Sequence, residues 1–168
     1  GAAAAATHMG LWDFAPSLAA AEPPTVAKPT VRVVFIRPEE PVVVSWPGGN
    51  CDVAAQQALF TRILTEAAGP LEISLDIQAQ PMSKPEEVAG LLAEIEKAPP
   101  DGLIVCAMEL TLWTLVNQIV ENRGDTPTIV YSNLSAFTAH LQCGRNTKKT
   151  FVAATQDAGW LASGLRML

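Results

Sequence analysis

Five polar residues of this sequence stand where a parallel α/β sheet would bind a ligand. Arg37 and Glu39 follow one apolar run, Glu109 follows a second, and Asn133 and Asp157 follow two later ones. Guanidinium, amide and carboxylate groups form directional hydrogen bonds, and this mixture suits the hydroxyl groups of a sugar or another polyhydroxy ligand. We therefore predict these five residues as ligand-binding. Because loops are polar in most proteins, an ordinary solvated rim is the competing interpretation.

No complete catalytic constellation accompanies these residues, so we assign no catalytic residue. The stretch Trp46–Asn50 precedes a helical pattern and offers backbone N–H groups to an anion, but it lacks both the G-x-G-x-x-G pattern and the lysine of a phosphate-binding loop. Cys51 begins that helix, where the dipole favours a thiolate; without a nearby histidine, a structural cysteine is the alternative. Glu109 is the best single candidate for function, and stabilising the N-terminus of the next helix is its alternative role. His140 is isolated, and the sequence predicts no metal ligand.

The composition excludes several classes of partner. The 168 residues carry a net charge of −6, and the 11 Lys and Arg residues are scattered. An acidic chain without a basic stripe is not expected to bind nucleic acid or an anionic membrane. No stretch after the first 28 residues approaches the roughly 18 apolar residues of a membrane span. Cys51, Cys106 and Cys143 show no C-x-x-C spacing, which indicates neither a zinc site nor a complete disulfide framework.

Apolar runs alternate with helical patterns along the chain. Strands are predicted at residues 31–36, 71–77, 101–108, 126–131 and 150–154, with a short extra strand at 42–44. Helices are predicted at 51–68, after the capping-box spacing Ser83–Glu86, at 111–123, at 135–143 and from 157 to the last residue. Asn50 or Asp52 is expected to cap the first helix, whose buried face is predicted to include Gln56 and Phe60.

Five strands alternating with helices predict a doubly wound α/β fold. The turn residues 99–102 introduce an apolar run that is typical of a central strand buried on both faces. Right-handed crossovers make the flavodoxin-like order 2-1-3-4-5 the simplest topology for this parallel sheet, in a three-layer sandwich. Ligands bind such sheets outside the carboxyl ends of the strands, and this rule selects the five polar residues.

Residues 1–28 differ from the rest of the chain. Leu11, Trp12 and Phe14 are apolar, and small residues precede Glu22, as in the core and cleavage region of an export signal. We predict an export leader and linker at 1–28, a single α/β domain at 29–168, and a periplasmic location. A low-complexity leader on a cytoplasmic protein is the alternative. The last helical pattern meets no stop signal, so we expect the parent protein to carry further C-terminal domains.

Three stretches, Asp101–Val105, Pro127–Asn133 and Phe151–Ala154, together with the helical pattern from Asp157, resemble the N-terminal domain of L-fucose/L-arabinose isomerase-like proteins. The resemblance covers about residues 31–168. It implies a flavodoxin-like domain that packs in a homo-oligomer and helps to line a neighbour's sugar site. It also implies a parent ketol isomerase that uses a divalent metal, usually Mn²⁺. The metal ligands lie mainly in later domains of that family, so no cofactor is expected in this chain.

Two other classes of protein fit the same pattern. A type I periplasmic sugar-binding protein also begins with such an α/β lobe and is exported. An assembly domain without a ligand of its own is the third possibility. Whatever the parent protein does, this chain alone is expected to isomerise no sugar, because that reaction needs a positioned base and usually a metal.

Overall fold

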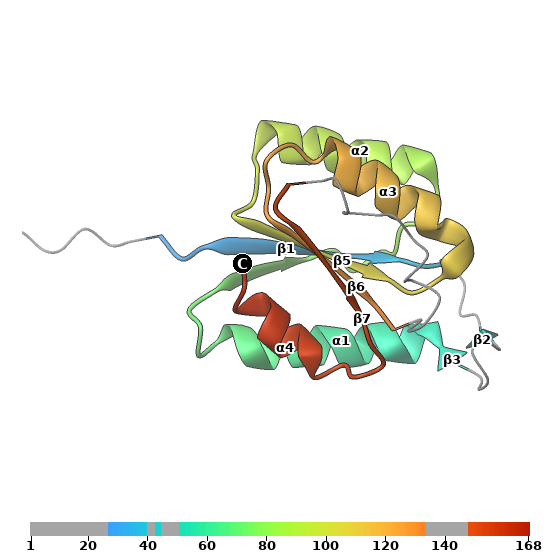
Figure 1. Cartoon of the computed structure of the whole chain (residues 1–168), viewed down its shortest axis with the longest axis horizontal. Helices are drawn as coiled ribbons and strands as arrows, with labels where there is room; N and C mark the ends of the chain where they lie inside the picture. The colour runs from blue at the N-terminus through green and yellow to red at the C-terminus, as the bar shows by residue number, and fades with distance from the viewer. Residues whose placement is uncertain (1–26, 40–42, 45–50, 134–147) are drawn as a thin grey trace, which may run out of the picture.

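The computed structural model describes residues 27–39, 43–44, 51–133 and 148–168, and its centre is a five-stranded parallel sheet (Figure 1). The strands are β4 (Ser74–Ile77), β1 (Thr30–Ile36), β5 (Gly102–Ala107), β6 (Thr128–Ser132) and β7 (Thr150–Ala154), in that spatial order. Renumbered within the sheet, this order is 2-1-3-4-5. The predicted flavodoxin-like α/β fold is therefore confirmed.

Strand β5 is the middle of the sheet. All six of its residues are buried, and it pairs in parallel with β1 on one side and β6 on the other. A strand covered on both faces must be apolar on both faces, which explains the unbroken run Leu103–Ala107. Ile104 and Leu103 are fully buried and point to opposite faces, so each serves a different core.

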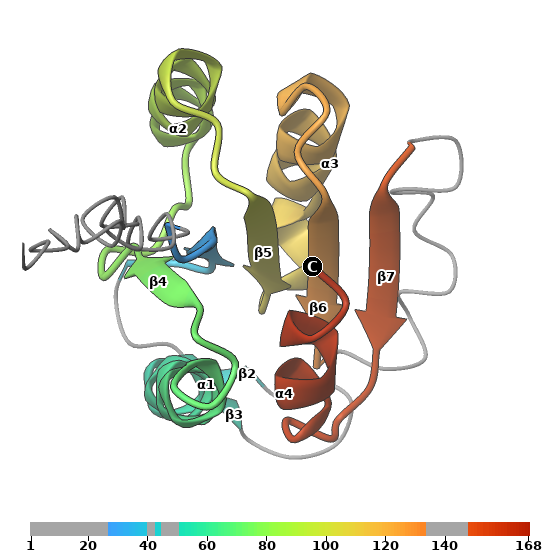
Figure 2. The same ribbon diagram turned by 90° about the vertical axis from the view of Figure 1, so that its left-hand side faces the viewer.

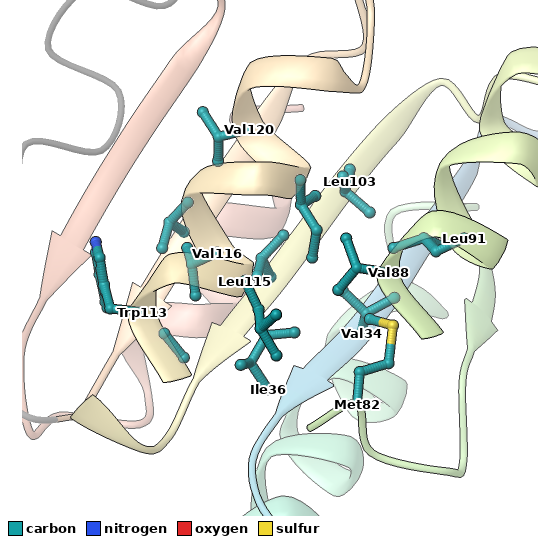
Figure 3. Close-up of a cluster of buried hydrophobic side chains, with 14 of the residues drawn as sticks. Val34, Ile36, Met82, Val88, Leu91, Leu103, Trp113, Leu115, Val116 and Val120 are labelled. Carbon is teal, nitrogen blue, oxygen red and sulfur yellow. The ribbon is translucent and has the colours of Figure 1, made fainter. Parts of the chain in front are cut away.

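Helices cover both faces of the sheet (Figures 1 and 2). On one face lie α1 (Val53–Ala68) and α4 (Trp160–Leu165); on the other lie α2 (Pro85–Lys97) and α3 (Trp113–Asn122), the latter preceded by the 3₁₀ turn η1 (Leu110–Leu112). Figure 3 shows the core under α2 and α3, where Val88 and Leu91 face Val34, Leu103 and Val116. The second core, under α1 and α4, contains Phe60, Ile104 and Tyr131. Two separate apolar cores hold the sheet rigidly between them.

The helix starts explain how the loops are held. Asp52 Oδ1 accepts hydrogen bonds from the backbone N–H groups of Ala54 and Ala55, at 3.0 and 2.9 Å, so Asp52 caps α1 as one of the two predicted candidates. At α2 the carboxylate of Glu87 accepts from the N–H groups of Ser83 and Lys84, at 2.7 and 2.9 Å. The prediction that Glu86 completes this capping box is wrong by one residue, because the helix begins at Pro85 and its third position is Glu87.

Other predicted boundaries also change. Strand β4 begins at Ser74 rather than at residue 71, because Glu72 has φ +56° and turns the chain before it can pair with β1. The short strand predicted at 42–44 is found as β2 (Val43–Val44), paired antiparallel with β3 (Cys51–Asp52). The helix predicted at 135–143 lies outside the described residues.

The last helix is shorter than the sequence pattern predicts. It ends at Leu165, and the chain then turns so that the Leu168 side chain lies over Gly102. A Cβ atom at position 102 would lie only 3.0 Å from Leu168 Cδ1, so a glycine there permits the close approach. The third helix ends as predicted, with Gly124 at φ +68° just beyond its cap.

Candidate functional site

The five predicted ligand-binding residues lie at one edge of the sheet. Strand pairing aligns the ends of β1, β5, β6 and β7 through Ile36, Ala107, Ser132 and Ala154. Neighbouring strands are about 4.8 Å apart, so the row from β1 to β7 spans roughly 14 Å. Arg37 and Glu39 belong to one end of this row, Glu109 and Asn133 to its middle, and Asp157 to the other end. One sugar ring cannot contact both ends at once.

Arg37 is the most firmly held member of the row. Its side chain is buried, Nε donates a 2.6 Å hydrogen bond to Gln57 Oε1, and Nη1 donates to the carbonyl oxygens of Pro38 (2.6 Å) and Glu39 (3.4 Å). Gln57 in turn donates from Nε2 to the carbonyl of Ala79, at 3.0 Å. Burial lowers the pKa of Arg37, partly offset by the Asp52 carboxylate, and the guanidinium remains charged. No described residue accepts a hydrogen bond from Nη2, so this donor can serve a ligand.

Glu39 behaves as a surface residue. Its side chain is 56% exposed and its carboxylate lies 4.0 Å from Lys84 Nζ. An exposed pair at this distance contributes little to stability. The carboxylate is thus available to hydroxyl groups of a ligand, although nothing rigid positions it.

Glu109 caps the turn that follows the central strand. Its Oε1 accepts from the backbone N–H and the hydroxyl of Thr111, both at 3.2 Å. This geometry matches the alternative role that the sequence left open, stabilisation of the next helix start. The capping also explains why α3 begins at Trp113 rather than at Thr111, since residues 110–112 form the 3₁₀ turn first.

Asp157 is likewise used by its own loop. Its Oδ1 accepts from the N–H of Gly159 at 2.9 Å, and its own N–H donates to Thr155 Oγ1 at 3.1 Å. These short-range bonds shape the entry into α4. Asn133 follows β6 directly and is partly buried. In the row of strand ends it stands between Glu109, which follows β5, and Asp157, which follows β7.

Tyr131 is a residue of this edge that the sequence did not single out. It is the only tyrosine of the chain and is fully buried on β6, with its ring edge-on to Phe60 at 5.2 Å and stacked on Trp160 at 6.3 Å. Its hydroxyl finds no hydrogen-bond partner among the described residues. Burial raises the pKa of Tyr131, and the neighbouring Cys106 and Asp157 raise it further. The signal available in the sequence was a single tyrosine in the predicted strand 126–131, whose other residues are Thr, Pro, Ile and Val.

In the part of the chain that the structure describes, no three His, Cys, Asp or Glu side chains lie close enough together to hold a metal ion. Cys106 is buried beside Tyr131, and burial raises the pKa of its thiol far above the usual range. A thiol in such surroundings is unreactive. His140, Cys143 and Trp46 lie outside the described residues.

No family model matches this chain, and neither a curated protein nor a solved structure is similar enough to count as a match. In the described ranges, no helix combines the length and the apolarity needed to cross a membrane.

Proposed function

We propose that this chain is the N-terminal domain of a sugar (aldose–ketose) isomerase-like protein, and that it lines the substrate without performing the reaction. The observation that supports this most directly is Arg37. It is a buried guanidinium at the carboxyl edge, fixed by Gln57 and two loop carbonyls, with Nη2 unused by any described residue. A fixed donor of this kind binds hydroxyl groups at little entropic cost.

Among the described residues of the same edge, no carboxylate is held free in the way that the base or metal ligand of an isomerase requires. Moving a proton between adjacent carbons of a sugar needs a positioned base, and usually a metal that stabilises the developing enediolate. The carboxylates of Glu109 and Asp157 accept local hydrogen bonds instead, and they stand on separate loops. We assign the chemistry, and a site for Mn²⁺, to further domains of the parent protein.

The remaining parts of the proposal concern the whole protein. The parent is an exported, periplasmic homo-oligomer whose leader occupies residues 1–28, or a cytoplasmic one if these residues are only a low-complexity extension. Its ligand is a small polyhydroxy molecule. These points derive from the sequence pattern and from the family resemblance.

An aldose–ketose conversion assay on the 168-residue chain, with Mn²⁺ supplied, tests the proposal. The expected result is no turnover, together with weak sugar binding by calorimetry. The matched variant is Glu109→Gln, which keeps the size of the side chain and removes its charge. Metal-dependent turnover that Glu109→Gln abolishes would make the domain an enzyme in its own right and would overturn the proposal.

The N-terminal lobe of a type I periplasmic sugar-binding protein is the second candidate. An arginine donor that no base among the described residues accompanies favours it equally, because a binding protein needs hydrogen-bond donors and no proton transfer. The two candidates differ in what the parent does with the sugar. Retention of an unchanged sugar by the full-length protein, with no isomerised product after prolonged incubation, would select the binding protein.

A further inference from the structure

The amino end of the sheet, opposite the candidate site, carries a groove between α2 and α3. Its volume is about 1030 Å³. The helix α2 contributes an apolar wall with Ala89, Leu92 and Ala93. Three carboxylates also line the groove, those of Glu96, Asp101 and Asp125. The groove is therefore apolar on its wall and acidic in charge.

A second surface at this end has the opposite charge. Phe151 on β7 is 46% exposed and Met167 after α4 is 57% exposed, and they are the large apolar side chains that the described part of the chain leaves most open to solvent. Basic residues adjoin both of them in the sequence: Lys148 and Lys149 precede β7, and Arg166 precedes Met167. All three basic residues are exposed, and within the described ranges no carboxylate forms an ion pair with them. We call these five residues the basic patch.

The groove and the basic patch meet at the same end of the molecule, on opposite faces of the sheet. Arg123 lines the groove, and its Nη2 donates to the carbonyl of Lys148 at 2.7 Å and to Thr150 Oγ1 at 2.6 Å. Leu168, next to the exposed Met167, covers Gly102, which follows the groove residue Asp101. Figure 1 shows the chain end beside the start of the sheet strands.

We propose that a second copy of this chain covers this end, with the basic patch of each copy against the acidic groove of the other. Two complementary surfaces at the same end of one molecule can both be satisfied by a single two-fold axis that passes between them. The apolar side chains of the patch and the wall of the groove supply the buried area, and the opposite charges set the register. The carboxyl edge stays open in such a dimer, so this inference is independent of sugar binding.

Charge reversal in the full chain provides the test. Asp125→Lys puts a positive charge into the groove, and Arg166→Glu puts a negative charge into the basic patch. Each variant alone should dimerise about tenfold more weakly or worse in sedimentation-velocity titrations, because like charges then face each other across both contacts. A one-to-one mixture of the two variants should recover the dimer, since each introduced charge then meets a charge of the opposite sign.

Matched control variants reverse exposed charges at the start of α2, which lies at the carboxyl end of the sheet, opposite both surfaces. Lys84→Glu corresponds to Arg166→Glu, and Glu86→Lys corresponds to Asp125→Lys; neither should change the dimerisation constant. Circular dichroism melts establish that all four variants fold. The proposal is overturned if the wild-type chain stays monomeric at every concentration reached, if the variants dimerise as the wild type does, if the mixture fails to recover the dimer, or if the controls weaken it equally.

Discussion

Two buried arginines mark the two ends of the sheet, and they are bound in different ways. At the amino end, every guanidinium nitrogen of Arg123 donates a hydrogen bond: Nε to Thr128 Oγ1, Nη1 to the carbonyl of Val120, and Nη2 to Lys148 and Thr150. These bonds join α3, β6 and the start of β7. At the carboxyl end, Arg37 uses Nε and Nη1 within its own neighbourhood, and no described residue accepts from Nη2.

The difference separates a structural arginine from one that can also bind. A buried guanidinium whose donors are all used holds its partners in place and has nothing left to offer a ligand. A guanidinium that is fixed by some of its N–H donors and keeps another donor unused presents that unused donor at a defined position. Two of the hydroxyl groups on β6 follow the same division. Thr128, at the amino end, accepts from Arg123 and donates to the carbonyl of Thr126 at 2.9 Å, whereas the Tyr131 hydroxyl has no described partner.

The largest effect is expected from Arg123→Met. The substitution keeps an apolar chain but removes the donors to two backbone carbonyls and two hydroxyl groups, so the free energy of unfolding should fall by about 3–5 kcal/mol. Urea denaturation followed by circular dichroism measures it. A loss below about 1 kcal/mol would show that Arg123 does not join the three elements.

A smaller loss is expected from the matched variant Arg37→Met. The buried Gln57 loses its donor, but the loop carbonyls of Pro38 and Glu39 lie nearer the surface and can turn toward water, so the cost should be about 1–3 kcal/mol. Sugar binding should weaken at the same time, whereas Arg123→Met should leave the affinity of the folded protein unchanged. The comparison fails if Arg37→Met destabilises the chain as much as Arg123→Met does and leaves sugar affinity untouched.

The smallest effect is expected from Tyr131→Phe. Removing a buried hydroxyl that has no partner should leave the free energy of unfolding unchanged or raise it by up to about 1 kcal/mol. The control is Thr128→Val, which removes a bonded hydroxyl from the same strand and should cost about 1–3 kcal/mol. Equal losses in the two variants would show that the Tyr131 hydroxyl has a partner after all.

The stability of the protein should also depend on alkaline pH, because two buried groups resist losing their protons. Burial raises the pKa of Tyr131 above its ordinary value of 10.0, so above that pH the unfolded chain releases a proton that the folded chain keeps. The stability is therefore fully present below pH 10.0 and falls as the pH rises, by about 1.4 kcal/mol per pH unit for this group. Cys106 adds a loss of the same sign that begins near pH 9.0. Chemical denaturation between pH 8 and 11 should show a shallower decline for Tyr131→Phe; identical slopes would refute the assignment.

The fold could be predicted from the sequence because it depends on local patterns. The run Leu103–Ala107 between turn residues determines the central strand, and right-handed crossovers then leave one simple strand order. Two predictions of local detail were wrong by a single residue. Glu87 rather than Glu86 caps α2, and Gln57 rather than Gln56 lies on the buried face of α1, because a shift of one position along a helix rotates a side chain by about 100°.

The site was predictable only in its position. The rule for parallel sheets selected Arg37, Glu109 and Asp157 from their places after strands, and the structure puts them at the carboxyl edge. Their partners were not predictable. Gln57 reaches Arg37 from 20 residues along the chain, and Arg123 reaches Thr150 from 27 residues away, and no periodicity encodes such contacts. Glu109 and Asp157 bind their own loops, and sequence spacing does not distinguish that role from ligand binding.

The central claim is that the carboxyl edge faces a polyhydroxy ligand and the amino end does not. Backbone amide shifts of the isotopically labelled full chain, recorded while an aldose and then the matching ketose are added, test it most directly. The account predicts saturable shifts at Arg37, Glu109, Asn133 and Asp157, with the amides around Arg123 unmoved. Saturable shifts confined to the groove between α2 and α3, or no shift with any sugar of either class, would contradict it.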